Sequence, residues 1–276
     1  MRVFGLDFTS APGNRKPITC ACCELYDNKL TVQTCRLFST FINFEHFLRQ
    51  DGPWIAALDF PFGQPHKLIV NLNWPHTWEG YVQYIAALGK AGFEESIQRY
   101  RVGREAGDKL HRRATDIRAG AISPMMLHRI PVGKMFFEGA PRLLAADVSI
   151  LPCHPTASDK IVLEGYPALV ARKWLGRQGY KSDERKKQSK EHLQARQKLV
   201  AALCSDELVG SYGLKLHLSE AIAAELVGDP MGDRLDAVLC AIQAAWSYMR
   251  RDQDYGIPPA QELEGWIVDP AMLVEQ

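Results

Sequence analysis

Three short apolar segments of the sequence each end in an acidic side chain. The segments VFGLDF, IAALDF and IVLEGY carry Asp7, Asp59 and Glu164. A carboxylate at the end of a buried strand is costly unless it is paired or binds a cation. If the strands are parallel, their ends meet at one edge of a sheet, where open α/β sheets bind ligands. Carboxylates gathered there would repel one another, and a divalent cation that prefers hard oxygen ligands, Mg²⁺ or Mn²⁺, would remove that penalty.

Two further acids stand in the last predicted helix. The helix is expected to begin near Asp229-Pro230, because an aspartate cap followed by proline in the first turn is a start signal. Asp233 and Asp236 are three positions apart, which places them roughly 60° apart on one helical face. They can join the strand-end acids in a metal site. Alternatively, acids in a first helical turn only favour the helix dipole.

Basic side chains in the middle of the chain are candidates for phosphate contact, because arginine can bind phosphate through two parallel hydrogen bonds. An acidic pocket repels phosphates, so some nearby group must hold them. We expect arginines on a rim that faces the acids. The arginines considered are Arg104, Arg112, Arg113 and Arg118.

Two other polar stretches each have a chemical and a structural interpretation. Thr9 and Ser10 directly follow Asp7 and can contact a phosphate or a metal-bound water, or simply cap a turn. The stretch 181–198 contains seven Lys/Arg and three acids. It can follow a phosphate backbone, or it can be the solvated face of a helix.

The elements that must position these residues indicate an α/β fold. Apolar runs predict strands, a hairpin-linked meander is followed by two strands reached through helical crossovers, and such crossovers demand parallel pairing. We therefore predict a mixed five-stranded sheet in the order 3-2-1-4-5, with helices on both faces. The five predicted strands are 3–8, 18–25, 30–38, 54–60 and 161–163. The predicted helices are 40–50, 166–176, 182–204, 219–227 and the last one.

The predicted domain organisation is one domain over residues 1–276, with a mainly helical insertion at about 66–150. The tail around Pro258-Pro259 is expected to be extended and to pack on the surface.

Composition restricts the possible partners. Lys+Arg 33 against Asp+Glu 32 gives a formal net charge of +1, so any nucleic-acid surface must be a local patch. Seven cysteines, an odd number without a secretory leader or zinc-ligand spacing, favour a reducing cytoplasm. No apolar run reaches the roughly 20 residues of a membrane span.

The order of the elements, with D-x-x-D-A opening the last helix, resembles the ribonuclease H-like fold. The segment GDRLDAVLCAIQAAW resembles its RuvC type. The chain is also similar to a family of unknown function that is predicted to contain RNase H-fold nucleases, the domain of unknown function 429 group. The segments that carry this resemblance are VFGLDFTSAP, AALDFPFG, HRRATD with AGAISPMML, VLEGYPALVAR, GDRLDAV and EGWIVDP.

This resemblance implies a metal-dependent nuclease acting on DNA or RNA. Asp7 would match the first-strand acid that bridges two metals, and Asp59 the fourth-strand acid. Asp236, with Asp233, would match the late helix acids that hold the second metal, and Glu164 is a further catalytic candidate. A two-metal site cuts a phosphodiester in line, without a protein nucleophile.

Two other functions are kept open. A sugar-kinase or actin-like relative shares this sheet topology, but it would need glycine-rich phosphate loops that are absent from the sequence. A non-catalytic nucleic-acid-binding protein could use the same fold as a scaffold. Carboxylates too far apart to share a metal would favour the scaffold.

Overall fold

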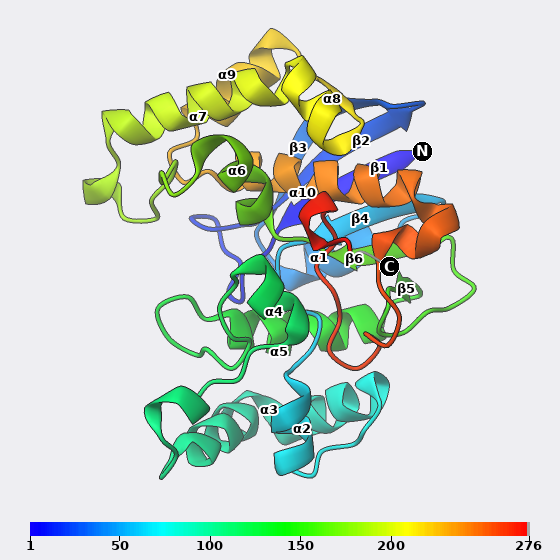
Figure 1. Cartoon of the computed structure of the whole chain (residues 1–276), viewed down its shortest axis with the longest axis vertical. Coiled ribbons are helices and arrows are strands. Elements are labelled where there is room, and N and C mark those ends of the chain that lie inside the picture. Colours follow the sequence, from blue (N-terminus) through cyan, green and yellow to red (C-terminus); the bar gives the residue numbers. More distant parts are fainter. Residues whose placement is uncertain (275–276) are drawn as a thin grey trace.

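The apolar runs of the chain assemble into one mixed sheet, which a computed structural model describes for residues 1–274 (Figure 1). The strands are β1 (Arg2–Asp7), β2 (Ile18–Tyr26), β3 (Lys29–Phe38), β4 (Trp54–Leu58), β5 (Ser149–Ile150), β6 (Lys160–Glu164) and β7 (Lys215–His217). Their spatial order is β5-β6-β4-β1-β2-β3-β7. Strand β2 is antiparallel to β1 and β3, and the remaining pairs are parallel.

The predicted count of five strands is wrong, because the sheet has seven. The five expected strands are neighbours in the expected order, and β1 pairs with β4 in parallel. The two additional strands lie at the edges and span only two and three residues. Segments this short contain too few residues to establish an alternating pattern.

Successive side chains of the central strands enter two separate hydrophobic cores, because alternate residues of a strand point to opposite faces. Val3 of β1 and Ile55 of β4 belong to the core beneath helix α10 (Asp233–Met249). Phe4 and Trp54 belong to the opposite core. This alternation decides on which face each strand-end acid emerges.

Helices cover both faces of the sheet (Figure 1). The first core is shared with α6 (Pro167–Leu175), α7 (Lys190–Leu203), α8 (Asp206–Tyr212), α9 (Glu220–Gly228) and α10. The second core is shared with α1 (Phe41–Leu48), α2 (His66–Asn71), α3 (Trp78–Arg101) and α5 (Val132–Leu144). A short helix, α4 (Ala114–Ala119), lies between α3 and α5 in the chain. Short 3₁₀ turns occur at Ala106–Asp108, Arg185–Lys187, Arg251–Gly256 and Pro270–Met272.

Two segments differ from their predictions. Helix α7 begins at Lys190 rather than near 182, because the Ser189 side chain caps it by accepting a hydrogen bond from the His192 amide at 3.4 Å. The tail is not confined to the surface: Ile267 bridges β6 in parallel and is 2% exposed. No helix within residues 1–274 combines the length and the apolar character needed to cross a membrane.

Candidate functional site

Strands β1 and β4 place Asp7 and Asp59 side by side. The parallel register pairs Leu6 with Leu58, so the next residues of the two strands, Asp7 and Asp59, also lie opposite each other. The Asp59 amide donates to the Leu6 carbonyl at 2.9 Å and continues the pairing past the end of β4. Both acids share the strand face of Val3 and Ile55, because side chains alternate. Both carboxylates therefore emerge on the face covered by α10.

Helix α10 can supply Asp236 because Gly5 lets it approach β1 closely. A Cβ atom at Gly5 would lie 2.0 Å from the Ala237 carbonyl oxygen and 2.1 Å from the Ala241 amide nitrogen. Only a residue without a side chain fits between strand and helix at this distance. Asp236, directly before Ala237, is thereby brought to the end of β1.

The start of α10 lies later than predicted. The helix begins at Asp233, after Gly232, whose φ of 74° is in the left-handed region. The Asp229 carboxylate accepts hydrogen bonds from the amides of Met231 at 3.1 Å and Arg234 at 3.0 Å. Asp229 thus caps the start of the helix, as the Asp-Pro pattern suggested. It does so from three residues before Gly232, which occupies the N-cap position itself.

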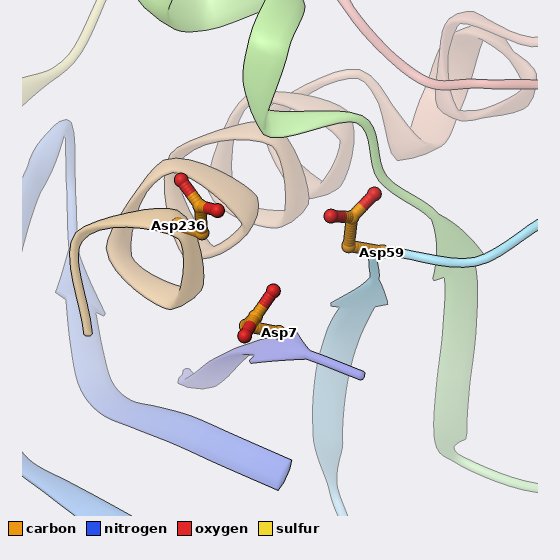
Figure 2. A group of neighbouring side chains, drawn as sticks. All are labelled: Asp7, Asp59 and Asp236. Carbon is orange, nitrogen blue, oxygen red and sulfur yellow. The ribbon is translucent and has the colours of Figure 1, made fainter. Parts of the chain in front are cut away.

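The three carboxylates of Asp7, Asp59 and Asp236 face one another (Figure 2). One oxygen from each lies within 4.8 Å of the others. Asp7 is 6% exposed, and its buried Oδ2 atom has no hydrogen-bond partner among residues 1–274. An unpaired buried oxygen is costly and calls for a ligand. A metal ion coordinated by three oxygens would satisfy it.

Burial and mutual repulsion make this cluster hard to ionise. Burial raises the pKa of Asp7 well above its usual range; Lys181 opposes this shift, and the three neighbouring aspartates add to it. Burial, followed by repulsion from Asp236, raises the pKa of Asp59 to about 7. Such shifts are typical of functional sites, where carboxylates are held together against their repulsion.

Two lysines already compensate part of the negative charge. The Lys181 ammonium forms an ion pair with Oδ2 of Asp236, and the Tyr180 hydroxyl donates to Oδ1 of the same carboxylate. Lys16, on the loop between β1 and β2, binds Asp233 at 2.8 Å. The sequence did not single out either lysine: Lys181 was considered only as part of the basic run 181–198, and Lys16 stands alone in a loop.

Asp233 lies beside the three central acids but outside the group that can share one ion. Its Oδ1 accepts from Lys16. Burial raises its pKa, and Lys16 lowers it.

Glu164 emerges on the opposite face of the sheet. It pairs in register with Leu58, not with Asp59, and therefore shares the face of Val162 and the second core. Its carboxylate binds the buried Arg113 guanidinium at 2.6 and 2.8 Å and accepts from the Phe62 amide at 2.9 Å. Glu164 thus does not join the three carboxylates that can hold an ion, since Arg113 neutralises it.

The chain matches the model of one protein family over most of its length. The match, described as "Protein of unknown function (DUF429)", extends over residues 5–262. The chain belongs to this family. The matched range contains Asp7, Asp59 and Asp236. No curated protein and no solved structure matches the chain.

Arg113 does not lie on an exposed rim facing the acids, as was expected from the sequence. It is 1% exposed, and its guanidinium is held by Asp116 at 2.7 Å as well as by Glu164. Its burial corrects the expectation that Arg113 lies on a rim facing the acids and holds phosphate. The preceding Arg112 is exposed.

The other predicted substrate-binding residues are dispersed. Arg104 pairs with Asp108 and lies 3.9 Å above the Tyr100 ring, and Arg118 donates to the Leu273 carbonyl. Within residues 1–274, neither forms an ion pair or a hydrogen bond with Asp7, Asp59 or Asp236. Thr9 Oγ1 accepts from the Ala11 amide at 3.4 Å, as a turn-capping hydroxyl does. Ser10 follows it in the same half-buried loop.

A narrow cleft opens beside Asp59. Its cavity volume is about 50 Å³. Its lining includes Asp59, Phe60, Ile122, Glu164 and Tyr166. Asp59 therefore borders both the carboxylate cluster and this cleft, and it is the member of the cluster with the most access to small molecules.

Proposed function

We propose that this protein is a divalent-metal-dependent nuclease that hydrolyses phosphodiester bonds on a ribonuclease H-like fold. Two features support the fold assignment. The antiparallel meander β1–β2–β3 is extended by the parallel strands β4 and β6, and a late helix, α10, crosses the first strand. These are the elements that the sequence resemblance requires, in the required order.

One observation carries the proposal: Asp7, Asp59 and Asp236 converge within 4.8 Å, and a buried Asp7 oxygen has no partner. The donor set consists only of carboxylates, which suits Mg²⁺ or Mn²⁺ better than zinc or copper. Asp7 and Asp59 would hold the ion from the strand ends and Asp236 from the helix. When bound, such an ion lowers the pKa of a water molecule and polarises a phosphoryl oxygen.

The residues of the chain would hold and orient the substrate around this cluster. Tyr180 and Lys181 fix the Asp236 carboxylate. Exposed basic residues of the segments on either side of Lys181, among them Arg177 and Lys186, are available for a phosphate backbone. With a formal net charge of +1, attraction of a nucleic acid would depend on such local groups.

The spacing of the carboxylates favours this proposal over a non-catalytic scaffold. Acids on a scaffold have no reason to stay within 4.8 Å of one another at the energetic cost of repulsion. The sugar-kinase and actin-like alternative lacks a supporting feature, since the loop after β1 has no glycine-rich phosphate motif.

The decisive variant is Asp7→Asn, which keeps the shape of the side chain but removes its charge. It should abolish Mg²⁺- or Mn²⁺-dependent cleavage of single- and double-stranded DNA and RNA. Without metal it should be as stable as the parent or more stable, because one repelling charge is gone. At manganese near 100 times the dissociation constant, the parent should gain about 2.7 kcal/mol, and the variant should lose most of this gain.

Asp252→Asn serves as the control, because Asp252 is exposed and outside the cluster. It should cleave and melt like the parent. An Asp7→Asn protein that is less stable without metal, or that still gains as much from manganese as the parent, would rule out the metal site.

A further inference from the structure

Asp236 is already occupied on both oxygens. Its Oδ1 accepts a hydrogen bond from the Tyr180 hydroxyl, and its Oδ2 forms an ion pair with the Lys181 ammonium. The carboxylate is fully buried. Asp7, in contrast, keeps Oδ2 without a partner. The three carboxylates are therefore not equivalent toward an incoming ion.

Lys181 is held in place by contacts along its neighbouring backbone. The Tyr180 carbonyl accepts from the buried Arg196 guanidinium at 2.8 Å. The Ser182 amide donates to the Pro230 carbonyl at 3.3 Å. These two contacts lie on either side of Lys181 and fix the point from which its side chain starts.

The stem of Lys181 passes over the start of α10 at Gly232. A Cβ atom at Gly232 would lie 2.9 Å from both Cβ and Cδ of Lys181. The glycine thus leaves room for the lysine stem to reach the first turn of the helix, where Asp236 lies. The side chain of Lys181 remains 36% exposed, so solvent reaches part of it.

Lys16 strengthens this arrangement from the other side. Its ammonium lies 2.8 Å from both Asp183 and Asp233. It thereby joins the loop that carries Lys181 to the first turn of α10. The ion pairs of two lysines therefore hold this loop against α10: Lys181 with Asp236, and Lys16 with Asp183 and Asp233.

The formal charges around the cluster match one divalent ion. The three central carboxylates carry three formal negative charges and Lys181 one positive charge, while Lys16 is shared between Asp233 and Asp183 outside this group. One divalent ion neutralises the remainder. A second divalent ion on Asp236 would have to displace Lys181 or stand beside its ammonium, which it would repel.

We propose that Lys181 takes the position of a second metal ion on Asp236, so that the free protein holds one divalent ion, bound by Asp7 and Asp59. This rests on the proposed function and changes its ligand set: Asp236 is held by Lys181 rather than by the ion, and the site pairs one metal with one fixed ammonium. When bound, such an ion would lower the pKa of a water molecule, and the Lys181 ammonium would remain on Asp236 as the second positive charge of the site.

The test is the number of Mn²⁺ ions bound per chain without nucleic acid, measured by equilibrium dialysis, together with their electron paramagnetic resonance spectrum. The parent should bind about one ion and show an isolated Mn²⁺ signal. Lys181→Met, which keeps the stem on Gly232 but removes the charge, should bind about two ions with the exchange-coupled signal of ions about 4 Å apart. Lys181→Arg should stay at about one ion.

Lys198→Met is the matched control, because Lys198 is an exposed lysine on α7 outside the cluster. It should bind about one ion, like the parent. If Lys181→Met does not fold, Lys181→Gln replaces it, and the measurement on the parent stands by itself.

Two coupled ions on the parent chain would overturn the inference and leave the proposed function intact. A single ion on a folded Lys181→Met chain would also overturn it. Absence of any Asp7-dependent Mn²⁺ binding would instead remove the proposed function, and the inference with it.

Discussion

At the scale of the residue, Asp59 links the protonation of the cluster to the stability of the fold. Burial, then repulsion by Asp236 and Glu164, raises its pKa from 3.8 to about 7, against the opposing effect of Lys181 and Lys16. In the unfolded chain the carboxyl is ionised above about pH 4. Between these two values the folded protein holds a proton that the unfolded chain has released.

We expect the metal-free protein to lose stability as the pH rises from 5 to 8, because the unfolded chain binds fewer protons than the folded one in this range. The rise of the Asp59 pKa from 3.8 to about 7 corresponds to an upper limit of about 4 kcal/mol in the free energy of unfolding, because a tenfold change in the ionisation constant is worth about 1.4 kcal/mol. Urea denaturation with a chelator at both pH values measures the loss. Asp59→Asn should show a smaller loss than the parent, and an equal loss in both proteins would contradict the assignment.

Arg113 is a second residue whose role follows from its surroundings. Its guanidinium neutralises two buried carboxylates, Glu164 and Asp116, at 2.6 and 2.7 Å. Arg113→Met should destabilise the protein by about 3–5 kcal/mol, because it leaves both charges buried without a partner.

The neighbouring Arg112→Met is the control and should change the free energy of unfolding by less than about 0.5 kcal/mol, since Arg112 is exposed. Denaturant unfolding compares the two. A stable Arg113→Met protein that loses only nucleic-acid binding would restore Arg113 to the substrate surface.

At the scale of the element, the packing of α10 on β1 determines whether the site exists. The closest approach is at Gly5, where an added Cβ would lie 2.0 Å from a backbone oxygen of the helix. Backbone atoms in a helix cannot move aside singly. Any side chain at position 5 must push α10, and Asp236 with it, away from Asp7 and Asp59.

Gly5→Ala should therefore lower the free energy of unfolding by at least about 3 kcal/mol, the upper end for overpacked cores. It should also reduce the stabilisation by manganese. Gly210→Ala is the control: position 210 is helical, and nothing lies within 4 Å of the added Cβ, so stability should stay equal or rise by up to about 1 kcal/mol. Thermal melts with and without manganese test both. A Gly5→Ala protein that melts and responds to manganese like the parent would contradict the inference that a side chain at position 5 displaces α10.

The elements also explain which parts of the site the sequence could reveal. Long apolar strands and the D-x-x-D helix start were recognisable, and they lead to Asp7, Asp59 and Asp236. Glu164 ends its strand in the same way but is one residue out of register, which turns it to the other face. Register between distant strands depends on tertiary pairing, which a single strand does not encode. Lys181 could not be distinguished from the other basic residues of its run.

At the scale of the whole molecule, the C-terminal segment is part of the core rather than a surface tail. Trp266, Ile267 and Val268 are at most 3% exposed. The buried Asp269 carboxylate accepts from the Tyr212 hydroxyl at 2.7 Å and from the Gln243 amide at 3.0 Å. The segment thus joins α8, α10 and the end of β6.

Removing the chain from residue 265 onward should abolish cooperative unfolding, because it exposes the apolar surface beneath these residues and leaves buried polar groups without partners. Far-UV and near-UV circular dichroism during a melt measure this. The control Val274→Ser changes a half-exposed side chain and should melt like the parent. A truncated chain with a sharp, unshifted melt would mean that the segment contributes nothing to the core.

The close packing of α10 on Gly5 has a consequence for biosynthesis. Asp7 leaves the ribosome long before Asp236, which lies far downstream in the chain. A nascent polypeptide can pair β1 with β4 and hold two carboxylates together, but the third arrives only after α10 has emerged and settled on the sheet. The buried cluster is therefore complete only after α10 has been synthesised and packed, and it cannot guide the pairing of β1 with β4. Products that end before α10 would lack both Asp236 and the helix that covers the other two carboxylates, and would be left to proteolysis.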